Sequence, residues 1–171
     1  MALPEEIFGR VWRLGDHVNT DVLHPSSYFS LNEGRIKEGL LEGMGRLSVG
    51  ANIDLFNEGI VIVGGQNFGC GSSRETSVRA LHTCGVKGVV ATSFARIFFR
   101  SLVNLGIPAF LCGEIQNWAK DGDLIHISLK EGTIDLENTR RFRFSPIDPH
   151  IKKILEAGGL IPYLRREKDG I

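Results

Sequence analysis

The chain has 171 residues, of which 42% are hydrophobic and 23% charged, a composition typical of one globular domain with its own core. Twenty Lys and Arg balance twenty Asp and Glu without a block of like charge, which argues against proteins that bind nucleic acid or anionic membranes. The apolar runs are about strand length, far short of the roughly 20 residues of a membrane span. Glu5 and Glu6 stand where a signal peptide carries lysines, so we expect a cytoplasmic protein.

The N-terminal quarter divides into one regular and one irregular segment. Residues 7–15 (IFGRVWRLG) predict a strand. Residues 16–43 are polar and punctuated by Pro25 and several glycines, and their pattern favours neither helix nor strand. Long irregular connections are usually functional or mobile, so this segment is a candidate part of the site.

The middle of the chain alternates strand and helix. The β-branched run 59–65 (GIVIVGG) predicts a buried strand, and 86–92 and 107–112 predict two more. Between them we expect a helix over 73–83 that buries Val78, Leu81 and His82, and a second over 94–106 with Ser93 as its N-cap. Short connections of this kind predict a parallel β-α-β-α-β unit with right-handed crossovers.

The C-terminal part has a different pattern. Residues 123–138 alternate apolar and polar around a turn near Glu131 and Gly132, which predicts a β-hairpin. Asp148 as N-cap and Pro149 at the first helical position predict a short helix, with Gly158 beyond its end. Without an internal repeat or a low-complexity linker, residues 1–171 are expected to form a single mixed α/β domain.

The glycine-rich stretch 64–72 is the first candidate for a site. A helix start presents unpaired N–H groups and a partial positive charge, and glycines let the backbone approach an anion. The stretch has neither the lysine of a P-loop nor the third glycine of a dinucleotide loop. Arg74 stands at the helix start instead, and its planar fork suits a carboxylate. The alternative is that Ser72, three residues before Glu75, only caps the helix while Arg74 lies in solvent.

Cys70, Cys84 and Cys112 are widely and unequally spaced, and no zinc or iron–sulfur site follows from their spacing. We expect Cys84 and Cys112 to be small buried hydrophobes of a reducing compartment. Cys70 lies inside the glycine loop, and its role stays open.

Four segments carry a resemblance to a known family. They are 67–75 (NFGCGSSRE), 88–110 (GVVATSFARIFFRSLVNLGIPAF), 15–21 (GDHVNTD) and 156–164 (EAGGLIPYL). Together they resemble the small subunit of 3-isopropylmalate dehydratase, which is equivalent to the swivelling C-terminal domain of aconitase and homoaconitase. The resemblance spans most of the chain and implies a three-layer β/β/α swivelling domain of the aconitase C-terminal type.

The resemblance implies a hydro-lyase that interconverts 2-isopropylmalate and 3-isopropylmalate in leucine biosynthesis, through an unsaturated intermediate. By position, Ser72 would be the base, Arg74 the ligand of a substrate carboxylate, and Ser73 and Gly71 further substrate contacts. A [4Fe–4S] cluster is expected on a partner large subunit and none on this chain, which would be active only in that complex. The isolated chain could form a homo-oligomer.

The chain departs from the family pattern at two places. Thr76 stands where many relatives have histidine. Ser27 occupies the position of an arginine in the loop tied to substrate choice, and His24 replaces an apolar residue. The candidate specificity loop is Ser27, Tyr28, Phe29, Ser30 and Leu31.

Because this loop has no cation, it favours a substrate with an apolar substituent. The alternatives are a loop that has drifted or compensation by His24 or Arg35. Two alternative functions remain. One is that of a related hydro-lyase acting on homoaconitate, on 2-methylmalate and citraconate, or on dimethylmalate; the other is that of a non-catalytic module that binds an anion.

The sequence gives weaker indications of a role in the site for several other residues. Asp16, Thr20 and Asp21 could shape the mouth of the site or form turns, and nothing local makes His17 a ligand. Arg96 and Arg100 fit a solvated face, an interface or a ligand contact. We expect structural roles for His82, His126 and His150.

Overall fold

The computed structural model describes residues 3–47, 58–71, 75–137 and 140–169. The strands are β1 (Glu6–Arg13), β2 (Ile60–Gly64), β3 (Gly88–Ala91), β4 (Ala109–Leu111), β5 (Leu124–Ser128), β6 (Thr133–Leu136) and β7 (Arg140–Arg143). The α-helices are α1 (Thr20–Leu23), α2 (Glu33–Leu47), α4 (Glu75–Thr83), α5 (Arg96–Asn104), α6 (Pro149–Glu156) and α7 (Leu160–Asp169). Single 3₁₀ turns lie at Ser26–Tyr28 and Ile115–Asn117.

All seven strands form one mixed sheet in the order β4-β3-β2-β1-β5-β6-β7. The strands from β4 to β1 are parallel, whereas β5, β6 and β7 continue the sheet as antiparallel neighbours. Strand β1 joins the two halves, because it pairs with β2 on one side and with β5 on the other. The sheet therefore contains strands from the N-terminal, central and C-terminal parts of the chain.

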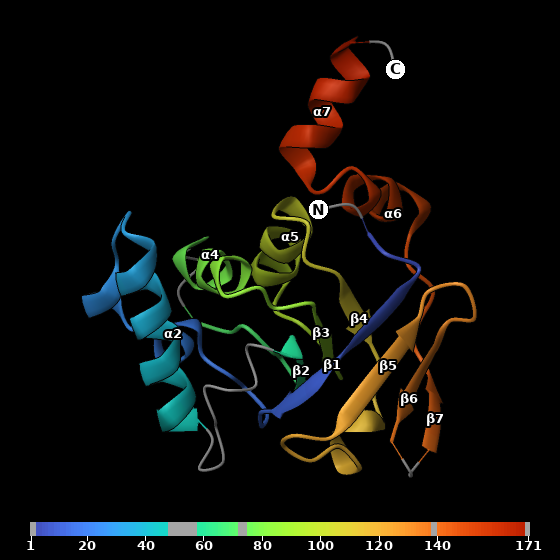
Figure 1. The fold of residues 1–171 in the computed structure, drawn as a ribbon, viewed down its shortest axis with the longest axis horizontal. Helices are drawn as coiled ribbons and strands as arrows, with labels where there is room; N and C mark the ends of the chain where they lie inside the picture. Colours follow the sequence, from blue (N-terminus) through green and yellow to red (C-terminus); the bar gives the residue numbers. More distant parts are fainter. Residues whose placement is uncertain (1–2, 48–57, 72–74, 138–139, 170–171) are drawn as a thin grey trace.

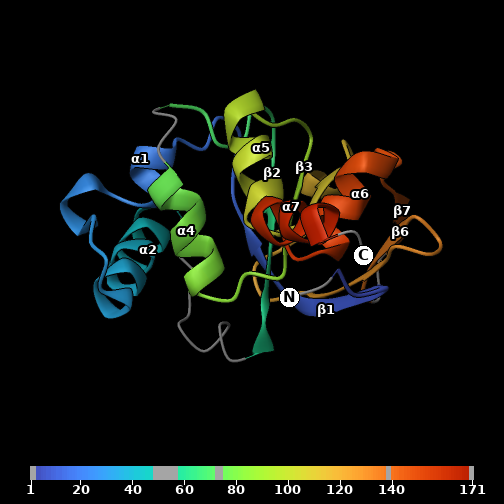
Figure 2. The same ribbon diagram turned by 90° about the horizontal axis from the view of Figure 1, so that it is seen from above.

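Successive residues of the central strands point into two different cores, as the period of a strand requires. Ile60 and Ile62 face a core that includes side chains of α2, α4 and α5, whereas Val61 and Val63 face a second core shared with β5, β6 and β7. The sheet curls so that its two halves enclose this second core (Figure 1, Figure 2). Helices, parallel strands and antiparallel strands form three layers, and the predicted β/β/α arrangement is confirmed.

The predicted parallel unit is confirmed, with α4 and α5 as its crossover helices. Val78 and Leu81 are buried as expected, but His82 is exposed on the last turn of α4. The prediction that Ser93 caps the second helix is wrong: α5 begins at Arg96, and its N-cap is Ala95. The predicted cap at Ser72 lies outside the described residues.

The segment without a predicted element contains two helices, α1 and α2. Helix α2 includes four glycines, which are poor helix formers, so sequence periodicity alone did not identify it. Tertiary contact explains two of them. A side chain at Gly43 would overlap the carbonyl oxygen of Leu23, and one at Gly39 would reach within 2.6 Å of His24 Nε2. These two glycines therefore allow α2 to pack directly against α1 and against His24, the residue that follows α1.

The predicted hairpin is confirmed by the antiparallel pair β5 and β6, and the predicted helix by α6, whose N-cap Asp148 accepts from two backbone N–H groups. The edge strand β7 and the helix α7 were not predicted. Helix α7 projects away from the rest of the molecule (Figure 1). None of the described helices is both long and apolar enough to span a membrane.

Candidate active site

The candidate site lies where the parallel strands β2 and β3 end, which is the edge at which open α/β sheets bind ligands. Residues 65–71 follow β2 directly, and the described part of α4 begins at Glu75. The predicted site residues Ser72, Ser73 and Arg74 lie outside the described residues. The described part of the site is therefore the glycine loop 65–71 and the segments that hold it.

One side of the glycine loop is bound to residues 15–20 by backbone hydrogen bonds that alternate in direction. Gly65 N–H donates to Gly15 O (3.0 Å) and His17 N–H to Gln66 O (2.7 Å). Further along, Gly69 N–H donates to Val18 O (3.0 Å) and Thr20 N–H to Cys70 O (2.9 Å). The two segments that resemble the family, far apart in sequence, therefore lie side by side up to the last described residues of the loop.

Asp16, Thr20 and Asp21 have different positions in this arrangement. The Asp16 carboxylate accepts from Gln66 N–H (2.7 Å) and so fixes the start of the glycine loop. Thr20 is buried, and its carbonyl oxygen accepts from the hydroxyl of Ser77 on α4 (3.1 Å). Asp21 is exposed in α1, where its N–H donates to the side chain of Asn19 (2.8 Å). Asp16 and Thr20 therefore hold the loop, whereas Asp21 lies on the surface of α1.

The other side of the loop is bound to the residues between β3 and α5. Asn67 N–H donates to Ser93 Oγ (2.8 Å), Phe68 N–H to Ser93 O (2.9 Å) and Ala95 N–H to Phe68 O (2.9 Å). Ser93 therefore positions the glycine loop instead of capping α5. This function was missed from the sequence because the partners of Ser93 lie 26 residues away along the chain.

Packing of Phe68 anchors the centre of the loop. Its side chain is completely buried, with ring centroids 5.7 Å from Phe98 and 6.2 Å from Phe94. Gly69 follows with a φ of +80°, and a side chain there would overlap the Phe98 ring. Glycine is required at this position because both the backbone conformation and the space exclude a side chain.

His17 and Asn67 have left-handed backbone conformations, with φ of 52° and 50°. Their exposed side chains meet, with Asn67 Nδ2 3.4 Å from His17 Nδ1. Backbone strain of this kind occurs preferentially at functional sites. The pair was missed because no local signal joins residues 50 positions apart.

The three cysteines are free thiols. Cys70 in the glycine loop is half-buried, and its thiol donates to the carbonyl oxygen of His17 (3.1 Å), so it contributes to the contact between the two segments. Cys112 is buried as predicted, whereas Cys84 is only half-buried. Burial raises the pKa of Cys84 to about 11 and also raises the pKa of Cys112. No three His, Cys, Asp or Glu side chains of the described residues lie together as metal ligands would.

Comparison with known proteins identifies the family. Residues 52–110 match the aconitase C-terminal domain family. The chain is 37% identical to 3-isopropylmalate dehydratase small subunit 1 of Methanopyrus kandleri (94% of each chain) and 41% identical to the methanogen homoaconitase small subunit of Methanothermobacter thermautotrophicus (96% of this chain and 95% of the relative). The crystal structure of a 3-isopropylmalate dehydratase from Methanocaldococcus jannaschii superimposes with a TM-score of 0.83 at 36% identity, over 95% of both chains.

The chain belongs to the small-subunit family of 3-isopropylmalate dehydratase and homoaconitase. Its relatives are hydro-lyase small subunits, and the fold is the swivelling domain of the aconitase C-terminal type. The relatives differ in the substrate that their names state: a third, from Methanocaldococcus jannaschii, is an isopropylmalate/citramalate isomerase small subunit (38% identity, 94% of this chain and 95% of the relative).

In this family member, the candidate specificity loop forms the 3₁₀ turn and the residues after it. Arg35 lies against it: its Nη2 donates to Ser27 O (2.8 Å), and its guanidinium lies 5.5 Å from the centre of the Tyr28 ring. Leu31 is 83% exposed. The Arg35 side chain is therefore held by the loop itself.

His24 anchors the base of the same loop from inside the protein. Its ring is fully buried, stacks on Phe29 at 5.7 Å, and lies with Nε2 3.1 Å from Ile36 O. Nε2–H donates to this carbonyl, so Nδ1 carries no proton, and Nδ1 has no hydrogen-bond partner among the described residues. Because burial disfavours the charged imidazolium, the pKa of His24 is lowered. Burial also excludes His24 as a substrate ligand.

We expect a pH dependence of stability from His24. At pH values between the lowered pKa of the folded state and about 6.5, the pKa in the unfolded state, the unfolded chain binds a proton that the folded chain does not. The full contribution to stability is therefore present above about pH 6.5. It declines as the pH falls below that value, by up to about 1.4 kcal/mol per pH unit. In His24→Leu this part of the slope should vanish. Urea unfolding of both proteins between about pH 5 and 8 measures the difference. An identical slope in the two proteins would contradict the assignment.

Two other histidines lie away from the site. His126 Nε2 is 2.6 Å from Glu6 Oε2 on the sheet, and its hydrogen bond helps to lower the pKa of Glu6. The ring of His150 packs edge-on against Tyr163 of α7 at 5.6 Å. Both rings therefore contact other side chains of this chain, away from the glycine loop.

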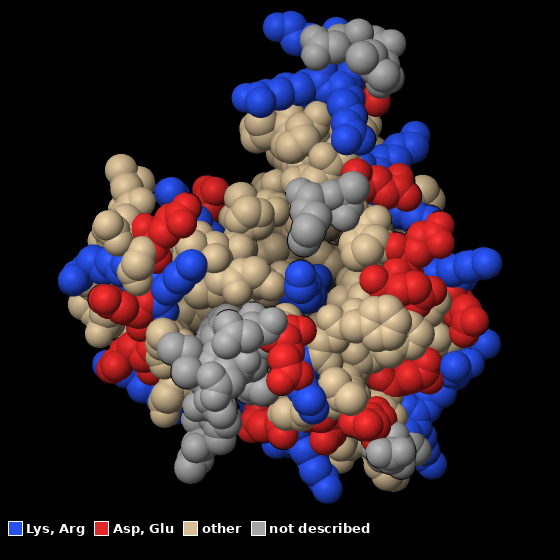
Figure 3. Space-filling view, viewed as in Figure 1, with Lys and Arg blue, Asp and Glu red and all other residues tan. Residues whose placement is uncertain are grey.

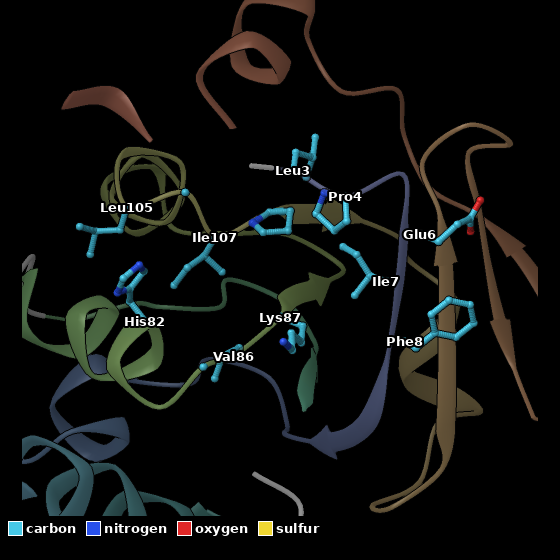
Figure 4. A pocket seen from close by; sticks show the side chains of 13 residues that line it. Leu3, Pro4, Glu6, Ile7, Phe8, His82, Val86, Lys87, Leu105 and Ile107 are labelled. Atoms are coloured by element: carbon cyan, nitrogen blue, oxygen red, sulfur yellow. The ribbon is translucent and has the colours of Figure 1, made fainter. Parts of the chain in front are cut away.

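A separate pocket of about 380 Å³ lies at the opposite edge of the parallel strands, between the start of β1 and the loops before β3 and β4 (Figure 4). Leu105 and Ile107 are part of its apolar lining, and His82 and Lys87 are its basic residues. The C-terminal ends of α4 and α5 lie here, where the helix dipole disfavours an anion. The pocket is not part of the candidate active site.

Proposed function

We propose that this chain supplies half of the active site of a cytoplasmic hydro-lyase of leucine biosynthesis, which interconverts 2-isopropylmalate and 3-isopropylmalate. The observation that carries the proposal is the glycine loop, because segments 15–20 and 93–95 hold it rigidly at the edge where strands β2 and β3 end. Ser72, Ser73 and Arg74 follow this loop directly in the sequence. We also propose that residues 1–171 form one domain, since a single sheet joins both ends of the chain.

In the proposed reaction, Ser72 takes a proton from the substrate carbon next to the one that bears the hydroxyl. That hydroxyl leaves, giving an unsaturated dicarboxylate and water, and the addition of water in the opposite sense gives the isomer. Arg74 pairs with a substrate carboxylate through its planar fork, while Ser73 and the N–H of Gly71 donate further hydrogen bonds. The start of α4 adds a partial positive charge that favours the anion.

The proposed large subunit carries a [4Fe–4S] cluster that acts as the Lewis acid for the leaving hydroxyl. Two observations support the placement of the cluster on the large subunit. The relatives are named as small subunits, and the spacing of the cysteines in this chain does not fit a cluster site. What this chain contributes is the base, the carboxylate ligand and the loop that positions them.

The assay that tests the function uses the chain co-expressed with its large subunit. Hydration and dehydration are measured for isopropylmalate, homocitrate and homoaconitate, 2-methylmalate and citraconate, and dimethylmalate. We expect the highest kcat/KM with isopropylmalate. Failure to associate with any cluster-bearing chain, together with tight phosphate binding, would instead favour the non-catalytic module.

Homoaconitase activity is the second candidate, because the relative at 41% identity carries that name and Arg35 contacts the specificity loop. Isopropylmalate is preferred because Arg35 is held by Ser27 O and the Tyr28 ring, which leaves the exposed Leu31 for an apolar substituent. A kcat/KM at least about tenfold higher for homoaconitate would reverse this order.

Arg74→Lys should lower kcat/KM by at least about tenfold, equivalent to about 1.4 kcal/mol, because lysine keeps the charge but loses the planar fork. Arg79→Lys is the matched control, since Arg79 is an exposed arginine of α4. Steady-state kinetics of the complex measure both variants. Equal kinetics for Arg74→Lys and wild type would remove Arg74 as a substrate ligand.

A further inference from the structure

An apolar groove of about 530 Å³ lies between α5, α6 and the end of β4. Its floor and walls are mainly aromatic and aliphatic: Phe94, Phe99, Val103, Leu111, Ile151 and Ile154. Leu111 is 40% exposed, and the neighbouring Ile97 of α5 is 56% exposed. An open apolar groove with exposed aliphatic side chains marks an interaction site more often than a solvated face.

Two arginines line the groove together with these apolar side chains. Arg96 and Arg100 are four residues apart on α5, so they lie on the same side of the helix. Neither has a carboxylate partner among the described residues. Arginine beside apolar and aromatic surface is the composition of the centre of a protein interface, and here its complement is an acidic side chain.

The groove is continuous with the candidate active site. Ser93 and Phe94 line it, while Ser93 also binds the glycine loop and Phe94 packs against Phe68. A protein that covers the glycine loop to complete the site therefore has this groove directly beside its contact surface.

Charge argues against occupation of the groove by helix α7 of a second copy. That helix exposes Ile161 and Leu164 (58% and 51% exposed), but it is basic overall, with Arg165, Arg166 and Lys168 against Glu167 and Asp169. Figure 3 shows Lys and Arg side chains around this projecting helix. Placing it beside Arg96 and Arg100 would bring like charges together.

We propose that the α5–α6 groove is a docking site for the large subunit and receives a segment with apolar side chains flanked by Asp or Glu. The proposal rests on the proposed function, which requires such a partner. Apolar side chains of the segment fill the groove, and its carboxylates pair with Arg96 and Arg100.

The test is the affinity of the full-length chain for its large subunit, measured by titration calorimetry and, separately, by the dependence of turnover on large-subunit concentration. In the double variant Arg96→Glu/Arg100→Glu, the dissociation constant should rise at least about tenfold, because two attractions become repulsions. The affinity of the wild type should fall with added salt more steeply than that of the variant. Turnover at saturating large subunit should stay near the wild-type value, because the variant weakens assembly of the complex and leaves the catalytic residues unchanged.

Lys130→Glu is the charge control, because Lys130 is exposed in the β5–β6 turn and does not line the groove. It should bind like wild type. Arg96→Ala/Arg100→Ala, which introduces no new charge, should weaken binding less than the double reversal, and circular dichroism checks that each variant folds.

Wild-type affinity for the double reversal, or an equal loss in Lys130→Glu, would overturn the docking site. So would a change in the oligomeric state of the isolated chain without a change in affinity for the large subunit, since the groove would then bind a second copy. Failure of the proposed function has a different signature, namely a wild-type complex that assembles but turns over none of the hydroxy acids.

Discussion

Replacement of Ser72 by alanine is expected to reduce kcat of the assembled complex by about 100- to 10,000-fold, the usual contribution of a general base. Affinity for the large subunit should not change, because the substitution removes one hydroxyl from the site. The measurement is turnover per complex at saturating large subunit. Ser145→Ala is a control with normal turnover expected, since Ser145 is exposed and it is its backbone N–H that donates to Leu111 O (2.9 Å).

A second variant separates catalysis from helix capping. Asparagine keeps a side-chain oxygen that can cap a helix, but it has no hydroxyl to act as a base. If Ser72 is the base, Ser72→Asn should lose as much turnover as Ser72→Ala. If Ser72 only caps α4, alanine should cost about 1 kcal/mol of stability, and asparagine should restore both stability and turnover.

Local signals account for the parts of the fold that were predicted correctly. Strand β2 is a β-branched run closed by glycine, and α6 begins with Asp148 and Pro149, so each carries its boundaries in a few adjacent residues. The hairpin of β5 and β6 likewise depends on residues close in sequence. Such elements are predictable because their partners are local.

The elements that were missed depend on distant partners. Helix α2 has poor helix formers at Gly39 and Gly43, and both positions are explained only by contact with α1 and the residues that follow it. Strand β7 has the sequence RRFR, in which only Phe142 faces the core, too short an alternation to identify a strand. Tertiary packing outweighed local propensity in both cases.

The same distinction holds for the candidate site. The glycine loop was identified from its own composition, because an arginine at a helix start and the absence of a P-loop lysine are local features. What holds the loop was not identified: Ser93 was expected to cap α5, yet it binds Asn67 and Phe68. The sequence therefore predicted the candidate site, and the structure showed which residues hold the glycine loop.

Gly69→Ala is expected to be the most damaging single substitution in the described part of the loop. A φ of +80° costs a residue with a side chain about 1–2 kcal/mol, and the added methyl would overlap the Phe98 ring, which adds about 1–3 kcal/mol of overpacking. The free energy of unfolding should therefore fall by about 2–5 kcal/mol, as measured by urea unfolding of the isolated chain. Turnover per assembled complex should fall as well, because Phe68 and the loop shift together.

Two comparisons identify the cause of that loss. Gly45→Ala on α2 is the control, because no atom lies within 4 Å of the added methyl and alanine favours a helix, so stability should rise by about 0.5–1 kcal/mol. In a Phe98→Ala background the ring is gone, and Gly69→Ala should cost only the backbone part, about 1–2 kcal/mol. An equal cost with and without the ring would assign the effect to φ alone. Wild-type stability of Gly69→Ala would show that neither the backbone conformation nor the contact with Phe98 requires glycine.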